Sequence, residues 1–290
     1  MDNHVLNDPG VKMINPCCKL DSSWELDTVN SDEFDGNSLD SDKWYDYAPG
    51  WRGRREYINR KENVSVANGS LLLEARRISP DDMEPEDRAS GILPYTMPIV
   101  KSRNKVLYGY FECSAKGCSA EVRNAFWLYD PLSDDLDAKY SPGNCSEEID
   151  IYEFIGKFKE KQHPEYLLSA AVHRFATPYV EGLVNSVKSK LPDDVKLVPM
   201  DSPPAEAFHT YSLLWTPFEI VWFADGKEFH RRKNDYFHRP MHIVFDCEIF
   251  PWCGAKICNF TPEDSPAVHE IQYFRRWNRD WKQHADSQKK

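Results

Sequence analysis

The stretch Glu148-Ile149-Asp150-Ile151-Tyr152-Glu153 decides the fold, because it places three carboxylates inside an apolar, strand-like run. The β-branched and aromatic residues of this run favour a buried β-strand over a solvated, charged strand face. Side chains alternate along a strand, so Glu148 and Asp150 point the same way. Glu153 would face the opposite side of a regular strand, but one bulged residue returns it to theirs. We therefore predict three acids on one face.

Two carboxyl groups on one wall are what the cleavage of a glycosidic bond requires, one as nucleophile and one as proton donor. On one short strand Glu148 and Glu153 should lie roughly 5–5.5 Å apart, which predicts a retaining mechanism; the inverting alternative needs roughly 6.5–9.5 Å. Asp150 lies between them and can orient the attacking carboxylate, and its charge helps to keep a proton on a neighbour. Spacing alone does not decide which Glu attacks.

Composition limits the function classes. The net charge of −11 and the pI near 5.3 argue against a nucleic-acid partner, which usually meets a basic face. No apolar run is long enough for a membrane span. We predict that residues 1–23 are a poorly structured leader without signal-peptide features and that residues 281–290 are a solvated tail. The eight cysteines show no zinc-ligand spacing, and we expect most of them to be buried free thiols; short loops closed by Cys113–Cys118 or Cys253–Cys258 remain an alternative.

Short runs rich in Val, Ile, Leu, Tyr and Phe alternate with turn-forming residues over the rest of the chain. Such strands, without helical periods between them, predict one all-β domain over residues 24–280, built as a sandwich of two antiparallel sheets. We expect loops at 79–95, 130–147 and 185–207. The predicted strands are 63–66 and 70–75, joined by an Asn68-Gly69 turn, then 106–115, 124–129, 148–155, 167–174, 210–215, 219–223, 241–249 and 269–276, with a turn at 224–227.

The acidic stretch resembles the ExDxxE signature of the family 16 glycoside hydrolases. The resemblance covers residues 24–278 and includes Lys43-Trp44, Tyr108-Gly109-Tyr110-Phe111-Glu112 and Trp215-Thr216-Pro217. It implies a jelly-roll sandwich whose concave sheet forms the substrate cleft. It also implies that Glu148 is the nucleophile, that Glu153 is the acid/base and that Asp150 assists.

Within this family, the chain is similar to the agarase and porphyranase branch, which acts on red-algal galactans. Two residues separate Asp150 from Glu153, as in that branch, and the run 49–54 is similar to its Trp-x-Gly-Arg element. Arg52 and Arg54 can bind sulfate bidentately, and Trp51 can stack on a sugar face. The alternative is that these arginines form salt bridges to the acidic surface.

The remaining substrate contacts follow from the same resemblance. Trp127 matches the aromatic platform under the cleaved sugar, and His173 should lie on the strand beside the catalytic one. Glu248 and Trp252 are expected on the far side of the cleft. Two features depart from the agarase pattern, namely the run Val122-Arg123-Asn124 before Trp127, where agarases tend to have small hydroxylated residues, and the acidic loop 130–147.

The sequence therefore predicts an endo-acting, retaining galactanase for porphyran or agarose. A carrageenan- or furcellaran-type galactanase and a laminarinase-like β-1,3-glucanase share its mechanism, and a non-catalytic jelly-roll lectin is the alternative of a different class. We expect no metal in the active site and no cofactor for the chemistry, although the family resemblance allows a structural Ca²⁺. The expected partner is a polysaccharide, sulfated or neutral. We also expect a monomer that is secreted, periplasmic or attached to the cell surface.

Overall fold

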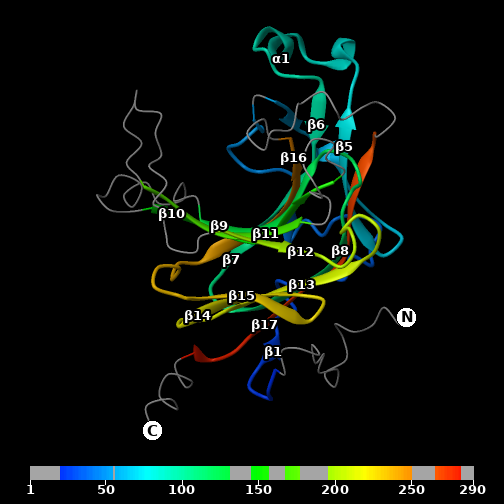
Figure 1. Ribbon diagram of the computed structural model, residues 1–290. Coiled ribbons are helices and arrows are strands. Elements are labelled where there is room, and N and C mark those ends of the chain that lie inside the picture. Colours follow the sequence, from blue (N-terminus) through cyan, green and yellow to red (C-terminus); the bar gives the residue numbers. More distant parts are fainter. Residues whose placement is uncertain are drawn as a thin grey trace.

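The computed structural model describes residues 20–54, 56–130, 145–156, 167–176, 195–249 and 265–281. The strands of the described residues form two large sheets, so the predicted all-β sandwich is confirmed (Figure 1). Within the described residues every strand pairing is antiparallel except that between β3 and β6. Among these residues, no helix is both long and apolar enough to cross a membrane.

The larger sheet has ten strands, in the order β15-β14-β13-β8-β17-β5-β6-β3, with β1 beside β17 and β4 beside β5. Its strands are β1 (Glu25–Leu26), β3 (Ile58–Asn59), β4 (Val64–Ala67), β5 (Ser70–Arg77), β6 (Tyr95–Met97), β8 (Gly109–Lys116), β13 (His209–Trp215), β14 (Glu219–Ala224), β15 (Lys227–Lys233) and β17 (Ala267–Asn278).

The smaller sheet has seven strands, in the order β12-β11-β10-β9-β16-β7-β2, and it is visibly curved in Figure 1. Its strands are β2 (Trp44–Tyr45), β7 (Ile99–Val106), β9 (Arg123–Asp130), β10 (Cys145–Ile155), β11 (Leu167–Ala176), β12 (Val195–Pro199) and β16 (Met241–Glu248). The predicted acidic strand is β10, between β9 and β11.

Aromatic side chains fill the space between the two sheets. Phe126 of β9 stacks on Phe245 of β16, with 4.4 Å between the ring centroids, and both rings meet Phe274 of β17 edge-on. Tyr152 of β10 lies 4.2 Å from Tyr211 of β13, again between ring centroids. These contacts fix which face of β9, β10 and β16 points inward, so the opposite face of the smaller sheet carries the polar residues.

Two tight turns follow their predicted chemistry. Asn68 and Gly69 both have positive φ, of 56° and 73°, as do Asp225 and Gly226, at 46° and 77°. Two consecutive residues with positive φ are typical of the type I′ turn, whose twist matches that of the strands it joins. The predicted hairpins at these two places are confirmed.

The strand predicted over 106–115 is confirmed from Gly109 onward, as β8, but its start at Val106 is wrong, because the chain changes sheet between these two residues. β7 ends at Val106 in the smaller sheet and β8 begins at Gly109 in the larger one. Tyr108 and Gly109 take positive φ values of 54° and 133°, which a continuous strand cannot contain. Strands β7 and β15 were not predicted over most of their lengths.

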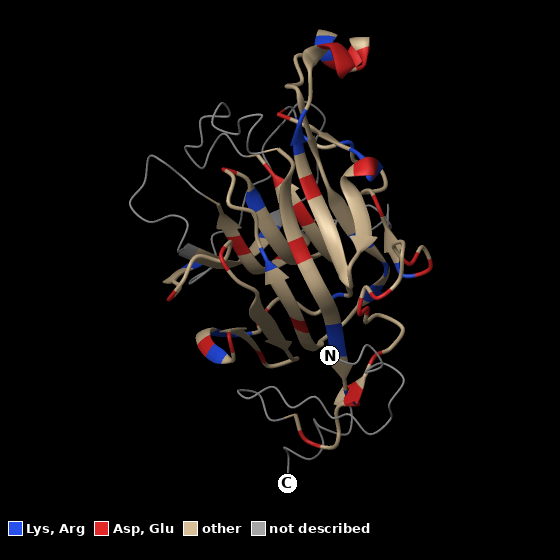
Figure 2. Ribbon diagram, turned by 90° about the vertical axis from the view of Figure 1, so that its right-hand side faces the viewer, with Lys and Arg blue, Asp and Glu red and all other residues tan. Residues whose placement is uncertain are grey.

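Two predicted loops contain regular structure. Residues 79–95 hold the 3₁₀ helix η3 (Pro80–Asp82) and the helix α1 (Pro85–Ala89), and 185–207 hold strand β12. A second 3₁₀ helix, η2 (Lys61–Asn63), precedes β4. The segment with α1 projects beyond the ends of β5 and β6 (Figure 1), and its charged residues stand out at the top of Figure 2 above a mostly uncharged sandwich.

Three of the predicted free thiols are confirmed, because Cys113, Cys118 and Cys247 are buried and form no disulfide. A disulfide between Cys113 and Cys118 is therefore ruled out. Residues 1–19 of the predicted leader, residues 131–144 of the predicted loop and residues 282–290 of the predicted tail lie outside the described residues.

Candidate active site

The bulge predicted in the acidic strand is present. Asp150 pairs with Trp127 of β9 and Tyr152 pairs with Phe126, so Ile151 is the extra residue on β10. Beyond the bulge, Glu153 pairs with Ala125. The β9 partners of Glu148, Asp150 and Glu153 are therefore Tyr129, Trp127 and Ala125, which alternate along a regular strand. Because paired residues share a face, the three carboxylates lie on the same face of the sheet.

The opposite face of β10 anchors the strand in the core. Tyr152 is fully buried and its hydroxyl lies 2.6 Å from Nε2 of His269 in the other sheet. The indole of Trp222 donates a hydrogen bond of 2.8 Å to the backbone oxygen of Asp150. These contacts hold the backbone that carries the acids, so the positions of their side chains are set by the core of the sandwich.

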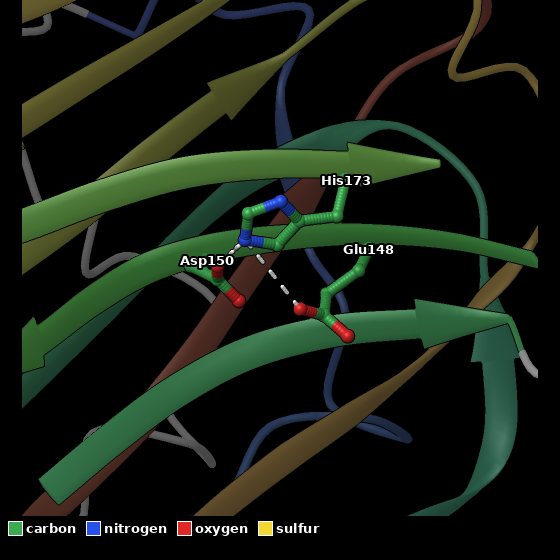
Figure 3. A group of neighbouring side chains, drawn as sticks. All are labelled: Glu148, Asp150 and His173. Carbon is green, nitrogen blue, oxygen red and sulfur yellow. Dashed lines mark ion pairs between the residues drawn. The ribbon is translucent and has the colours of Figure 1, made fainter. Parts of the chain in front are cut away.

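His173 joins two of the acids. It pairs with Glu148 across β10 and β11, and Figure 3 shows its imidazole pointing toward both carboxylates. Its Nε2 lies 3.2 Å from Oδ2 of Asp150 and 3.9 Å from Oε1 of Glu148. Polar atoms of all three residues lie within 4.8 Å of one another, a spacing that could also hold a cation.

Arg123 of β9 forms an ion pair with Glu153, and both side chains are mostly buried, with 16% and 15% exposed. Burial and the charge of Asp150 raise the pKa of Glu153 to about 8, although Arg123 acts in the opposite direction. Burial also raises the pKa of Glu148, and the charges of Asp150 and Glu153 add to this effect. Both carboxyl groups are thus harder to ionise than a carboxyl group in water.

These shifts have a chemical consequence. Two neighbouring carboxyl groups whose ionisation is mutually unfavourable release their protons in separate steps. Over the intermediate pH range one of the pair keeps its proton while the other is ionised. A proton donor beside an ionised carboxylate is the arrangement that double displacement at a sugar carbon needs.

Trp127 lies directly beside the acids, because it pairs with Asp150 across β9 and β10. Its Nε1 donates a hydrogen bond of 3.1 Å to Oδ2 of Asp246 on β16. The Trp127 ring is partly exposed and lies 5.3 Å from the ring of Tyr129, between centroids. An indole fixed in this way is suited to stacking on a sugar next to the carboxylates.

Glu248, Arg54 and Trp51 come together at one end of the same face. Nε and Nη2 of Arg54 donate bidentate hydrogen bonds, each 3.1 Å long, to the two carboxylate oxygens of Glu248. The Tyr57 hydroxyl donates a third, of 2.5 Å, to Oε1. The guanidinium carbon of Arg54 lies 5.9 Å from the centroid of the Trp51 ring, and Trp51 is 37% exposed. Arg54 is therefore fixed between a buried carboxylate and an exposed indole.

The side chain of Arg52 contacts α1 and not the acidic strand. Its Nη2 forms an ion pair of 2.7 Å with Oδ1 of Asp87 on α1, and its side chain is 71% exposed. Among the described residues, Arg52 forms no ion pair or hydrogen bond with the three acids. Trp252 lies outside the described residues.

Sequence reasoning missed three residues of this face, namely Tyr57, Arg123 and Asp246. Two of them follow from alternation, because Arg123 is in phase with Trp127 on β9, and Asp246 is in phase with Glu248 on β16. A strand assignment that used this phase for the flanking strands would have found both. Tyr57 comes from the irregular segment before β3 and carries no such signal.

Comparison with known proteins places this geometry among polysaccharide hydrolases. The family model "Beta-porphyranase A-D, GH16 domain" matches residues 24–282. A κ-carrageenase from Pseudoalteromonas carrageenovora is 30% identical over 284 residues, which cover 90% of this chain and 66% of that protein. The β-porphyranase B of Zobellia galactanivorans is 30% identical over 215 residues, which cover 70% of this chain and 67% of that protein.

Solved structures agree with the family model. The crystal structure of porphyranase B from Zobellia galactanivorans superposes with a TM-score of 0.71 at 25% sequence identity, covering 88% of this chain and 92% of the other. The chain thus spans about two thirds of the length of the two relatives named above and almost all of the crystallised chain.

Proposed function

Since the chain belongs to glycoside hydrolase family 16, within its β-porphyranase A–D group, we propose that it is an endo-acting, retaining hydrolase of a red-algal galactan, porphyran or agarose. The observation that carries the mechanism is the bulge at Ile151. It brings Glu148, Asp150 and Glu153 onto one face of β10, next to Trp127.

The proposed reaction has two steps. In the first, an oxygen of Glu148 attacks the anomeric carbon, the glycosidic C–O bond breaks, and Glu153 gives its proton to the leaving oxygen. In the second, Glu153 removes a proton from water, the water oxygen attacks the anomeric carbon, and the bond to Glu148 breaks. Stereochemistry at the anomeric carbon is retained because it inverts twice.

The neighbouring residues have supporting roles in this proposal. Asp150 and His173 orient Glu148, since His173 lies 3.2 Å from Asp150 and 3.9 Å from Glu148. Trp127 forms the platform under the sugar next to the cleaved bond. Trp51 and Arg54 contact a neighbouring sugar, with Glu248 holding Arg54 in place. Arg52 is proposed as an outer contact to sulfate, because most of its side chain is exposed.

The substrate proposal rests on the family group and on the pairing of an arginine with an exposed indole. A second candidate is a carrageenan-type galactan, which the 30% identity to a κ-carrageenase favours. Both candidates share the mechanism, so a comparison of substrates has to distinguish them. A long galactan is met outside the cytoplasm, so we propose that the protein is secreted or held at the cell surface and acts as a monomer.

The deciding experiment incubates the protein with porphyran, agarose, κ-carrageenan, laminarin and mixed-linkage glucan and measures new reducing ends. We expect activity on porphyran or agarose, and none in the Glu148→Gln variant, which should still bind the polysaccharide. Activity on κ-carrageenan alone would favour the second candidate. Activity on laminarin alone would contradict the galactan proposal while keeping the mechanism. Binding without any cleavage would support a lectin.

The chemistry is proposed to need no cofactor. Dialysis against a chelator should leave kcat unchanged, and a lower melting temperature after dialysis would reveal a structural cation. Loss of kcat with an unchanged melting temperature would contradict a cofactor-free reaction.

A further inference from the structure

One row of residues crosses the smaller sheet from the acids to its far edge. Asp150 of β10 pairs with Trp127 of β9, and Trp127 pairs with Val244 of β16. Val244 pairs with Lys101 of β7, and Lys101 pairs with Tyr45 of β2. Because paired residues share a face, all five side chains lie on the face that carries the carboxylates.

The row has a definite length. Neighbouring strands lie about 4.8 Å apart, so four steps place Tyr45 roughly 19 Å from Asp150. A hexose unit is about as long as one strand spacing. A polysaccharide that starts from a sugar stacked on Trp127 and continues along the row would therefore reach Lys101 and Tyr45 a few sugars away from the cleaved bond.

The far end of the row has the composition of a sugar-binding surface. The rings of Tyr45 and Tyr47 lie 5.5 Å apart at 71°, and Tyr47 is 38% exposed. The guanidinium carbon of Arg103 lies 4.1 Å from the centroid of Tyr45, and Nζ of Lys61 lies 4.4 Å from that of Tyr47. The two tyrosines thus sit among cations, and the rings offer faces and edges for stacking on a sugar.

Charge distinguishes the two ends of the row. Around Asp150 lie Glu148, Glu153 and Asp246, with the guanidinium of Arg123 paired to Glu153 and the imidazole of His173 beside Asp150 and Glu148. Around Tyr45 and Tyr47 lie Lys61, Lys101 and Arg103, and Nζ of Lys61 lies 3.4 Å from Oδ1 of Asp46. An anionic substituent on a sugar is repelled at the acidic end and attracted at the cationic end.

We propose that Tyr45, Tyr47, Lys61, Lys101 and Arg103 form a distal subsite that binds an anionic, sulfate-bearing sugar unit of the polysaccharide, several sugars away from the cleaved bond. The inference rests on the proposed function, because the occupant is a remote part of the same substrate chain. The sulfate groups of the substrate are then bound mainly at the β2 edge of the smaller sheet, because Arg54, next to the acids, is already paired with Glu248.

The test compares a sulfated galactan tetrasaccharide with a decasaccharide of the same repeat as substrates. A tetrasaccharide bound across the acids cannot extend to Tyr45, whereas a decasaccharide can. The double variant Tyr47→Ala/Lys61→Gln should lose about tenfold in kcat/KM on the decasaccharide, mostly through KM, and stay within about twofold of wild type on the tetrasaccharide. Phe218→Ala, which removes a 48% exposed ring from the turn between β13 and β14, is the matched control and should change neither.

A second variant separates charge from stacking. Lys101→Glu should reduce kcat/KM on the sulfated decasaccharide more than on its desulfated form, because it reverses one charge without removing a ring. Equal losses on both chain lengths in the double variant, or no loss on either, would overturn the distal subsite. A wild-type protein that cleaves neither length would contradict the proposed function, and the subsite with it.

Discussion

Arg123 on β9 and Glu153 on β10 form an ion pair across neighbouring strands. The pairing follows from the bulge, because Arg123 pairs in register with Ile155, and Ala125 with Glu153. A guanidinium beside the proposed acid/base favours its ionised form, while burial and Asp150 favour the protonated form. Arg123 is therefore a positioning residue for Glu153, and it lowers the pKa at which Glu153 loses its proton.

Replacing Arg123 by Met should shift the basic limb of the pH profile of kcat/KM to higher pH, by about one pH unit. The sign follows from the pair, because removing the guanidinium raises the pKa of Glu153, which then stays protonated to higher pH. Arg123→Lys keeps the charge and should shift the limb less. A basic limb that moves downward, or does not move, would show that Arg123 does not act on the acid/base.

The stability of the protein should fall as the pH rises toward 8. The folded protein holds the proton of Glu153 up to a pKa of about 8, whereas the unfolded chain releases it near the ordinary value of 4.5. Between these values the folded state binds more protons than the unfolded state, so the free energy of unfolding decreases with pH, by roughly 1 kcal/mol per pH unit for this group.

Glu153→Gln removes that contribution. Its melting temperature should therefore change less than that of wild type between about pH 5 and about pH 8. Glu147, whose pKa burial raises to about 7, contributes a slope of the same sign, so the variant should keep part of the decrease. An identical decrease in wild type and variant would mean that Glu153 is not protonated in the folded protein at neutral pH.

Glu248 is buried and depends on Arg54 and Tyr57 for its hydrogen bonds. Arg54→Ala should lower the free energy of unfolding by about 1–3 kcal/mol, because it leaves a buried carboxylate without its cation. The loss is below that of a fully buried pair, since the Arg54 side chain is 36% exposed.

Adding Glu248→Gln to Arg54→Ala should recover part of this stability, because the uncompensated charge disappears. Denaturant unfolding of the two single variants and the double variant measures the coupling. Lys233→Ala, which breaks an ion pair between exposed side chains, is the control and should unfold like wild type. Additive losses in the double variant would mean that Arg54 and Glu248 do not stabilise each other.

The local patterns that predict the site are those within a single strand. The alternation of Glu148 and Asp150, together with the need for a bulge before Glu153, was sufficient to predict one acidic face, and the register of β9 and β10 confirms it. The Asn68-Gly69 and Asp225-Gly226 turns were predictable because their positive φ values select those residues.

What sequence reasoning missed depends on pairing between distant segments. Arg123 contacts Glu153 only because β9 lies beside β10, and Asp246 reaches Trp127 only because β16 lies beside β9. The wrong start of the strand predicted over 106–115 has a different cause. Val106 and Tyr110 continue an apolar pattern across the sheet change, and only the backbone at Tyr108 and Gly109 interrupts it.

Gly156 immediately follows β10 and has no room for a side chain. A Cβ there would lie 2.1 Å from the backbone oxygen of Ala120 and 2.5 Å from that of Cys118, and its own N–H donates to the oxygen of Val122 at 3.3 Å. Because backbone atoms cannot move aside like a flexible side chain, Gly156→Ala should displace the end of β10 that carries Glu153. We expect a loss of roughly 1–3 kcal/mol in the free energy of unfolding, and a lower kcat.

Gly36→Ala is the matched control, because the nearest atom to its Cβ would be the backbone oxygen of Ser38, at an ordinary 3.4 Å. That variant should melt within a degree or two of wild type and keep its activity, since Gly→Ala at an unstrained position costs little. Thermal melts and reducing-end assays on both variants provide the comparison. If Gly156→Ala were as stable and active as Gly36→Ala, residues 118–120 could not pack as closely against the end of β10 as the structure shows. That packing would then not be what holds Glu153 on the same face as Glu148.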